Sequence, residues 1–448
     1  MSTINLNTTT ATNGAGIDVT SVVDQILYAE RAPERLWQQQ QTALKAEGAA
    51  FSDLRTNLGT LNDAVIALKD ILGALAAKLV ESSKPEILNA SAQPSAMPGV
   101  HVVTVGNLAT TSSYYTDAVT SNAAFAGGKF EIKVGAGAAQ TITVDSTNNT
   151  VSTLAGSINN QNLGVTASVI RDANGARLAL VSKTSGDPGD ITVSGNTSGL
   201  NFYKSVTGKN ASLTLDGISL SSTTNTLAGA LEGVTLNLAT AAPDTEVLLT
   251  IGSDQKGAEQ AVQDFVSRYN SVISAINGQF ATGGNASTAG PLASNGSLRS
   301  LEMRLLSAAT HSMSGNNGFV NLASLGINMA NDGTLTVDAT KLHNVTSTHF
   351  AEFQNFFQSL TPTAGFAQSF SNTLKSLTDS TTGLVSLNLQ ENASKQSVVA
   401  KQISEFEDRL VARQKELIAQ YSRVDMMLRQ LPVLQSQISS QLDSLKKS

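Results

Sequence analysis

Histidines and acidic residues are the side chains from which catalytic or metal-binding chemistry would have to be built in this sequence. The four histidines are His101, His311, His343 and His349. The nearest two are six residues apart, which puts them on different faces of a helix, so we interpret them as surface or half-buried side chains. The GxSxG, HExxH and Walker loop patterns do not occur. We therefore predict no catalytic, cofactor-binding or metal site and no enzymatic activity.

Two short segments suggest binding chemistry at first sight. Residues 331–338 (NDGTLTVD) resemble the start of a calcium loop, but they lack the full acidic spacing and the terminal glutamate, and we predict a β-hairpin turn. Two glycines, Gly135 and Gly137, are not enough to indicate a phosphate-binding loop, and they are typical of the turn after a strand. Cysteine is absent, which excludes disulfides, thiolate metal sites and a cysteine nucleophile.

Composition and charge narrow the classes of partner. The chain has 448 residues, of which 41% are hydrophobic and 14% charged, with a formal net charge of -6. This balance gives no electrostatic reason to bind nucleic acid or an anionic membrane. No run of 18 uncharged apolar residues is present for membrane insertion. Residues 1–16 carry no basic start or apolar core, so we expect any export route to read an uncleaved N-terminus.

The elements that could position a binding surface begin with a helix near the N-terminus. Asp18 is a suitable helix N-cap, and Pro33 should end or kink the helix. Between them lies an apolar stripe at helical spacing, made of Val19, Val22, Val23, Ile26 and Leu27. Trp37, beside a glutamine run at 38–41, is either an anchor for a partner or packed against the chain's own helices.

A second helix is predicted from a longer apolar seam. Its members are spaced alternately three and four apart: Phe51, Leu54, Leu58, Leu61, Val65, Leu68, Leu72, Leu75 and Leu79. This heptad pattern is typical of a coiled coil, and we expect Pro85 to stop the helix. Because such helices draw most of their stability from packing, we predict that the seam packs against other helices of the same chain.

The middle of the chain changes to the alternating pattern of β-strands. The pattern occurs at 103–105, 130–134, 142–144, 165–169, 213–215, 234–238 and 247–251. Turn sequences close two hairpins, DANG at 172–175 and Asp216-Gly217. A short helix is expected around Leu154 to Ile158. Ser/Thr/Gly-rich connections near residues 120 and 205 divide this region into two lobes, one inserted in the other.

Helical patterns return at 261–276, 298–313 and 350–360, and a long apolar stripe runs from Ile403 to Leu445. Pro432 should bend this last helix. We predict an α+β fold in which the N- and C-terminal helices pair into a coiled-coil or helical-bundle leg, with two mainly antiparallel β lobes inserted between them. The predicted parts are terminal arms (1–42 and 405–448), a helical leg domain (43–95 and 254–404), an inner β lobe (96–120 and 205–253) and an outer β lobe (121–204).

The stripe at 19–36 follows a polar tail and the stripe at 417–445 ends the chain, so we predict that both dock on partner surfaces. The predicted docking and oligomerisation residues are Val19, Val22, Val23, Ile26, Leu27, Leu36, Trp37, Leu417, Tyr421, Val424, Leu428, Leu431, Ile438 and Leu442. A protein with such arms works by assembling into a larger structure.

Several segments carry a family resemblance. They are GIDVTSVVDQILYAERAPERL at 16–36, the seam at 51–72, VTVGNLAT at 103–110, residues 164–186, residues 213–238, NDGTLTVDATKL at 331–342 and the helix at 403–445. In this order they resemble the flagellar hook-associated protein 2 family, the filament cap proteins, and residues 164–186 resemble an inserted motif shared with flagellins. Two positions depart from the family pattern: Glu34 stands where an apolar residue is common, and Pro432 interrupts the last helix.

The resemblance implies a non-enzymatic, cofactor-free protein that is exported unfolded through the flagellar type III pathway. It implies a homo-oligomeric ring at the distal filament tip, with β lobes over the central channel and terminal helices between flagellin subunits. Flagellin would be kept from escaping and would fold beneath this plate. Neighbouring hook-associated proteins are further implied partners, and we expect an export chaperone at the C-terminal helix.

Other classes stay open at this point. A flagellin or a filament junction protein is disfavoured because the Arg-Leu-Ser-Ser-Gly step of flagellin N-termini is absent. A surface adhesin whose lobes bind host glycans fits the Ser/Thr/Asn-rich composition without being required by it. An enzyme would need a site that the sequence does not offer.

Overall fold

The computed structural model describes residues 16–120, 123–280, 289–358 and 365–445. The chain divides into a helical unit, formed by residues 1–69, 262–342 and 355–448, and a β unit, formed by residues 70–261 and 343–354. The named sheets of the β unit are antiparallel. The predicted α+β fold with terminal helices and inserted β lobes is confirmed.

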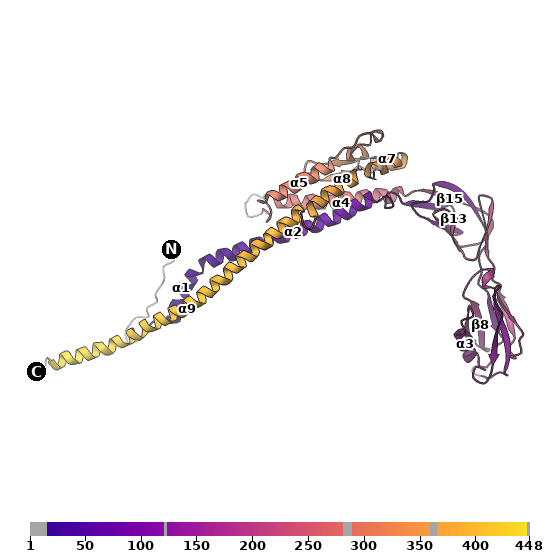
Figure 1. Cartoon of the computed structure of the whole chain (residues 1–448), viewed down its shortest axis with the longest axis horizontal. Coiled ribbons are helices and arrows are strands. Elements are labelled where there is room, and N and C mark those ends of the chain that lie inside the picture. The colour runs from indigo at the N-terminus through magenta and orange to yellow at the C-terminus, as the bar shows by residue number, and fades with distance from the viewer. Residues whose placement is uncertain (1–15, 121–122, 281–288, 359–364, 446–448) are drawn as a thin grey trace. The chain divides into compact units, whose positions relative to one another are not determined.

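The terminal helices are α1 (Val19–Glu30), α2 (Ala32–Lys69) and α9 (Leu384–Leu445). Within the helical unit α2 lies along α9, and α1 packs on a later part of α9 (Figure 1). The carboxylate of Asp18 caps α1, because it accepts a hydrogen bond from the backbone N–H of Ser21 at 3.1 Å. Pro33 falls in the first turn of α2, where its missing N–H breaks no helical bond.

The predicted seam of α2 is buried from Phe51 to Leu68, where each seam side chain is at most 2% exposed. It packs against α9 and α8 (Phe366–Thr378), so this helix finds its partners inside the chain. Beyond Leu68 the seam prediction is wrong. Helix α2 ends at Lys69, and in the turn that follows the Asp70 carboxylate accepts a hydrogen bond from the Leu72 N–H at 3.0 Å.

The last three predicted seam residues have separate positions. Leu72 is 69% exposed, Leu75 is buried outside any helix, and Leu79 lies in strand β1 (Lys78–Ser82). The three- and four-residue spacing of the leucines continues on both sides of Gly73, but Asp70 and Gly73 favour a turn over a helix. The chain from residue 78 pairs with β15 (Ala242–Ser253) instead. Residues 70–95 therefore belong with the β unit, and Pro85 does not stop a helix.

The remaining helices of this unit are built around aromatic side chains. They are α5 (Gly296–Ala309) and α8, with α4 (Gln255–Phe280) from residue 262 and α7 (Phe350–Gln358) from residue 355. Rings of Phe265, Tyr269, Phe356, Phe366 and Phe370 pack with centroids 5.4–6.2 Å apart. Helix α5 ends four residues before the predicted end at Met313. Residues 359–360 of the predicted helix at 350–360 lie outside the described residues.

The suspected calcium segment is a hairpin, as predicted. Strands β16 (Ile327–Met329) and β17 (Leu335–Val337) pair across it, and helix α6 (Ala339–Thr348) follows. Gly333 in the turn has φ +82°, a value that favours glycine. The Asp332 carboxylate accepts hydrogen bonds from the Thr334 backbone and hydroxyl, so it serves the turn.

The inner β lobe combines a five-stranded sheet, ordered β1-β15-β3-β11-β12, with a three-stranded sheet, ordered β13-β14-β2. The further strands are β2 (Leu88–Ala92), β3 (Gly99–Asn107), β11 (Ala211–Leu215), β12 (Ile218–Ser222), β13 (Thr226–Leu231) and β14 (Val234–Leu238). The predicted alternating residues of these strands share one core. Asp216 and Gly217, at φ +50° and +81°, close the predicted β11–β12 turn.

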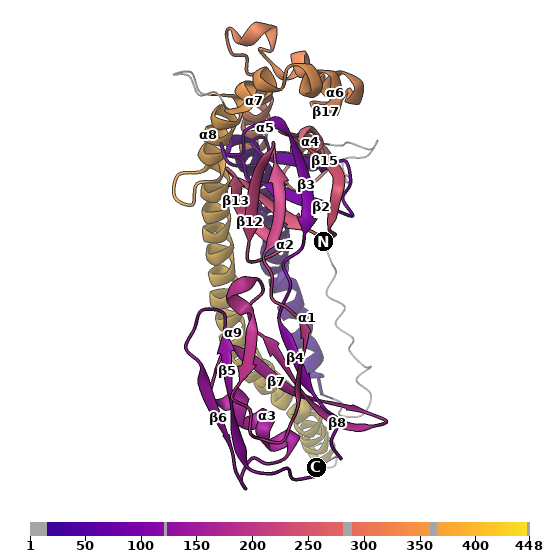
Figure 2. The ribbon, with the colours of Figure 1, turned by 90° about the vertical axis from the view of Figure 1, so that its right-hand side faces the viewer.

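The outer β lobe has sheets ordered β10-β4-β8-β7 and β6-β5-β9, with helix α3 (Val151–Asn160) packed on β7 (Figure 2). Its strands are β4 (Ser113–Thr116), β5 (Gly128–Val134), β6 (Gln140–Val144), β7 (Val165–Asp172), β8 (Gly175–Ser182), β9 (Ile191–Ser194) and β10 (Phe202–Val206). The predicted β7–β8 hairpin is confirmed, with Ala173 and Asn174 in its turn. Because β4 pairs with β8, the outer lobe begins before the predicted boundary at residue 120.

Candidate docking surface on the terminal helices

The apolar stripe of α1 is covered by the chain itself. Val23 and Leu27 are buried in one small cluster with Leu410 and Leu417 of α9. Val19, Ile26, Phe406 and Tyr421 are partly buried at its edge, and Val22 is also half-buried. The expectation that both terminal stripes lack a partner inside the molecule is therefore wrong for α1 and for the part of α9 up to Tyr421. The sequence could not supply this pairing, because α1 and α9 stand at opposite ends of the chain.

Trp37 also has a partner within the chain. Its ring meets the Phe406 ring edge to face, with centroids 5.4 Å apart and planes at 86°, and Trp37 is half-buried. Of the two interpretations of this tryptophan, packing against the chain's own helices is the one that the structure supports. Leu36, the neighbouring predicted docking residue, is exposed.

The C-terminal part of α9 is different, because residues 423–443 are exposed apart from Asp425, which accepts a hydrogen bond from Ile17 (Figure 1). The predicted docking residues there are 38–57% exposed: Val424, Leu428, Leu431, Ile438 and Leu442. Met426, Met427, Val433 and Leu434 are exposed as well, although they were not among the predicted docking residues. The helix continues through Pro432.

The chemistry of this exposed end suits a buried environment. Residues 430–442 (QLPVLQSQISSQL) contain no charged side chain, so burying them would require no ion to leave water. Glutamine and serine side chains can form hydrogen bonds to a neighbouring helix. An exposed apolar surface of this kind on one element is a candidate interaction site.

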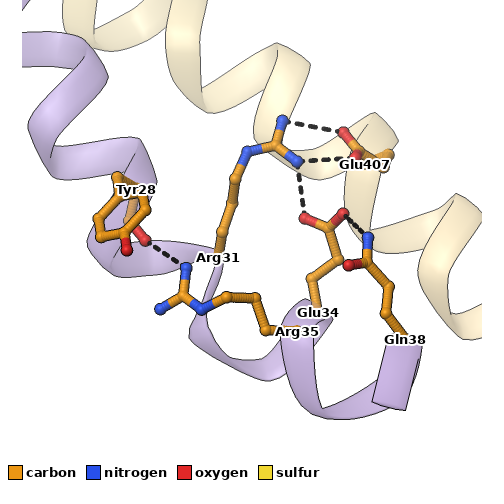
Figure 3. Close-up of polar contacts among 6 residues, drawn as sticks. All are labelled: Tyr28, Arg31, Glu34, Arg35, Gln38 and Glu407. Atoms are coloured by element: carbon orange, nitrogen blue, oxygen red, sulfur yellow. Dashed lines mark hydrogen bonds and ion pairs between the residues drawn. The ribbon is translucent and has the colours of Figure 1, made fainter. Parts of the chain in front are cut away.

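A charged clamp holds the elbow between α1 and α2 to α9 (Figure 3). The Arg31 guanidinium donates to both carboxylate oxygens of Glu407 on α9, at 2.7 and 3.1 Å. It also donates to Glu34 at 2.7 Å, and Gln38 Nε2 donates to the other Glu34 oxygen at 2.8 Å. Glu34 is only 4% exposed. The departure from the family pattern at Glu34 is thus accommodated by charge pairing instead of apolar packing.

The clamp shifts the ionisation of its members. Hydrogen bonding to Arg31 lowers the pKa of Glu407, and hydrogen bonding to Glu407 raises the pKa of Arg31. Both groups therefore stay charged through the neutral range. Arg35 lies on another side of the elbow, over the Tyr28 ring at 4.8 Å, and donates to the Tyr28 carbonyl at 3.0 Å.

Two further polar contacts join α9 to α1 and to the residue before the α1 N-cap. Arg413 lies 3.4 Å from Glu30, and the backbone N–H of Ile17 donates to Asp425 at 2.7 Å. Arg429 also donates to Asp425, and this bond, with the one from Ile17, lowers the pKa of Asp425. The contact between α1 and α9 therefore depends on a few buried apolar side chains and a series of charged groups.

A polar layer separates this contact from the apolar seam. Asn392 of α9, which is 4% exposed, donates to Glu47 of α2 at 3.2 Å, and Asn295 donates to the other Glu47 oxygen at 3.1 Å. Gln396 donates to Asn392 at 2.6 Å. A methyl group at Gly48 would lie 2.8 Å from the Asn392 oxygen, so the helices approach closely here. Single polar layers of this kind fix the register of paired helices.

Other residues with candidate chemistry do not converge. His343 contacts Glu259 at 3.0 Å, and His101 contacts Asp216 at 2.7 Å. Over the described ranges no three His, Cys, Asp or Glu residues lie close enough together to hold a metal ion. Within the same ranges no helix combines the length and apolar character needed to cross a bilayer.

Comparison with protein families gives two matches, one on each side of residues 113–207. Residues 208–432 match the model described as "Flagellar hook-associated protein 2 C-terminus", and residues 15–112 match "Flagellar hook-associated protein 2 N-terminus". These matches include the inner β lobe, the elbow, the clamp and most of α9.

Individual relatives agree with the family models. The B-type flagellar hook-associated protein 2 of Pseudomonas aeruginosa is 31% identical over 437 residues, which cover 90% of this chain and 89% of the relative. The flagellar hook-associated protein 2 of Escherichia coli K12 is 26% identical and covers 97% of this chain and 98% of that protein. The crystal structure of the D1-D2-D3 domains of the Escherichia coli flagellar cap protein is similar, with a TM-score of 0.59, 25% identity and coverage of 77% of this chain and 99% of that one. The chain therefore belongs to the flagellar hook-associated protein 2 family.

Proposed function

We propose that this chain is the structural cap at the distal end of the bacterial flagellar filament. In this role it retains exported flagellin at the tip and promotes its folding and polymerisation there. The assignment is carried by the match to a flagellar hook-associated protein 2 along 90% of the chain, together with the similarity of 77% of the chain to a solved flagellar cap protein. The protein acts outside the cell and works by occupying the growing end of the filament.

The uncovered end of α9 supports a docking mechanism. Residues 424–442 expose apolar side chains, and within them residues 430–442 carry no charge. Burial of that surface against helices of the filament stabilises the binding of the cap to the filament end through the hydrophobic effect. A surface so exposed also needs cover before assembly, which supports an export chaperone on the C-terminal helix.

The remaining parts have complementary roles in this proposal. Copies of the chain associate into a ring, in which the inner and outer β lobes form the plate over the channel. The apolar seam of α2 and the polar layer at Glu47 and Asn392 keep each leg in a single register. Flagellin and the neighbouring hook-associated proteins are the partners of the legs.

A deletion experiment tests the assignment. Cells that lack this chain should release unpolymerised flagellin into the medium and lose motility. If the chain were an adhesin, its loss would leave the filaments intact and reduce binding to host glycans. If it were another axial component, such as a filament junction protein, its loss would not be corrected by supplying cap protein from outside.

The docking mechanism is tested by substitutions on the exposed end of α9. We expect the triple change Leu431→Ser, Leu434→Ser and Ile438→Ser to abolish retention of flagellin while leaving the isolated chain folded. The matched control carries Gln430→Ser, Gln435→Ser and Gln437→Ser on the same turns. Equal function of both variants would contradict the mechanism.

A chain that lacks residues 1–40 and 410–448 tests the part played by both arms. It should keep folded β lobes and lose assembly in light scattering. If it kept the oligomeric state of the full chain, the lobes alone would hold the ring.

A further inference from the structure

The inner β lobe has a sheet edge with free backbone groups. Strand β12 lies at one end of the five-stranded sheet, so β11 pairs with one side of it. The two-residue turn Asp216-Gly217 makes Leu215 and Ile218 a hydrogen-bonded pair, and such pairs alternate with non-hydrogen-bonded ones along antiparallel strands. The backbone groups of Ser219 and Ser221 therefore point away from β11. In the part of the chain that the structure describes, no hydrogen bond from another element reaches these groups.

Elsewhere the chain closes strand edges with asparagine side chains. On the outer-lobe edge strand β7, Asn159 Nδ2 donates to the Ala167 carbonyl at 2.8 Å, and the Ala167 N–H donates to Asn159 Oδ1 at 2.8 Å. Asn270 of α4 makes the same pair of bonds to Leu335 of β17, at 2.8 and 2.7 Å. In each case the side-chain amide takes the position of a neighbouring strand. A further strand therefore cannot pair at these residues.

The other edge strands of the inner lobe are protected in different ways. Strand β1 carries Lys78 and Glu81, and charged side chains discourage the addition of another strand. Strand β13 has a register shift between Ala228 and Leu231, and β2 lies beside β1. Strand β12 pairs with β11 without a register shift, and residues 217–231 carry no charged side chain. It is therefore the edge of this lobe that is suited to pairing with another chain.

We propose that the free edge of β12 binds an extended segment of unfolded flagellin as an additional strand. This inference rests on the proposed cap function and gives that function a binding site for its client. An extended backbone can pair with Ser219 and Ser221 together, whereas a side-chain amide satisfies only one residue. In the proposed function flagellin folds at the tip, so it arrives there with main-chain groups that still lack partners. Binding through the main chain makes few demands on the flagellin sequence.

The side chains of β12 define the kind of segment that fits. Leu220 packs on the core of the lobe, and Ile218 on the same face of the strand is 66% exposed. Ser219 and Ser221 are exposed on the other face. An uncharged segment with alternating apolar and polar residues therefore continues both faces of the sheet. Because β12 has only five residues, the added strand forms few hydrogen bonds of small net value, and flagellin can leave the edge when it folds.

A second copy of this chain is the competing occupant of the edge. Two β12 strands could pair antiparallel, but the two copies would then be related by a two-fold axis. Such a pair closes on itself and builds no ring, so it does not serve the assembly proposed for this chain.

Photo-cross-linking in cells tests which chain occupies the edge. The photoreactive residue p-benzoylphenylalanine replaces Ser219 in the full-length chain, and sheared filaments regrow under illumination. We expect a cross-link to flagellin. The matched control places the same residue at Ser168, an exposed serine of β7 next to the position closed by Asn159, and should give little cross-linking. Equal cross-linking at both positions, or a cross-link from position 219 to a second copy of this chain alone, would overturn the inference.

Removal of an outward N–H tests whether the edge contributes to retention. Ser221→Pro deletes an N–H that faces away from β11, so no hydrogen bond of the sheet is lost. The loss of one main-chain hydrogen bond should weaken flagellin binding about fivefold and raise the release of flagellin during regrowth. Ser221→Ala keeps the N–H and should release as little flagellin as the natural chain.

Calorimetry checks that proline leaves the β unit folded. If Ser221→Pro lowers the transition of the β unit, Ser221→Lys takes its place, because it keeps the N–H and protects the edge with a charge. Release equal to that of Ser221→Ala in the folded variant would overturn the inference and leave the cap function untouched. Failure of the cap function itself would appear instead as normal filaments in the deletion strain.

Discussion

The end of helix α2 gives the sharpest quantitative prediction, because two leucines of one predicted seam have opposite environments. Leu58 is 0% exposed between α2 and its partners, whereas Leu72 is 69% exposed in the turn after the helix. Replacing each by alanine is the same chemical change in both places. We expect Leu58→Ala to destabilise the helical unit strongly and Leu72→Ala to have little effect.

The magnitude follows from the burial. Leucine to alanine removes about three methylene equivalents, which contribute about 0.8 kcal/mol each when fully buried, or about 2.4 kcal/mol. The cavity left at Leu58 adds to this loss, since the neighbouring helices relax only partly, so the total is about 3 kcal/mol. For a unit of a few hundred residues that corresponds to a fall in Tm of about 6–12 °C. At Leu72 the change in the free energy of unfolding should stay within about 0.5 kcal/mol.

Differential scanning calorimetry of the full chain is the assay. The β unit has cores of its own, so its transition serves as an internal reference in the same scan. Only the transition of the helical unit should move in Leu58→Ala. If Leu72→Ala lowers that transition as much as Leu58→Ala does, the seam continues past Lys69 and the reasoning is refuted.

Three other predictions concern single contacts. The Tyr269 hydroxyl is buried with no hydrogen-bond partner among the described residues, and burial raises its pKa. Tyr269→Phe should therefore raise the free energy of unfolding of the helical unit by about 1 kcal/mol, measured by urea denaturation. A loss of stability would show that the hydroxyl has a partner. Gly175→Ala should destabilise the outer β lobe by about 1–3 kcal/mol, because φ at Gly175 is +133° and the new methyl group would lie 2.4 Å from the Val119 carbonyl oxygen. An unchanged transition of this lobe in calorimetry would contradict the prediction. The pKa values of Glu407 and Asp425 are lowered in the folded chain, so both carboxylates stabilise the contact between α1 and α9. This stabilisation is complete above their ordinary pKa values of 4.5 and 3.8, and it is lost as the pH falls through the lowered pKa values. Protection of the amides of residues 19–30 against exchange should therefore fall as the pH drops through those lowered pKa values, and a protection factor that is independent of pH would show that these carboxylates do not hold α1.

Local patterns predicted much of the fold. The Asp18 cap, the buried seam up to Leu68 and the β7–β8 hairpin follow from helical spacing, strand alternation and turn chemistry. Each of these signals depends on residues within a few positions of one another. The resemblance to the filament cap family rested on the same local segments in order.

The candidate site was only partly predictable. Periodicity correctly marked Val23 and Leu417 as apolar positions on helices, but it could not say that they cover each other. In the sequence Glu34 is only a departure from the family pattern. Its environment is completed by the cation of Arg31 and the carboxylate of Glu407, and Glu407 lies on another helix.

The sequence by itself determined which faces of the terminal helices are apolar, where α1 begins and which segments form strands, because these depend on neighbours along the chain. Only the tertiary structure decided which apolar faces are covered, where the seam of α2 stops and how Glu34 is neutralised. Burial and charge compensation are properties of groups that meet in space. The Arg31–Glu407 pair joins residues 376 positions apart, and no spacing rule along a chain reaches that far.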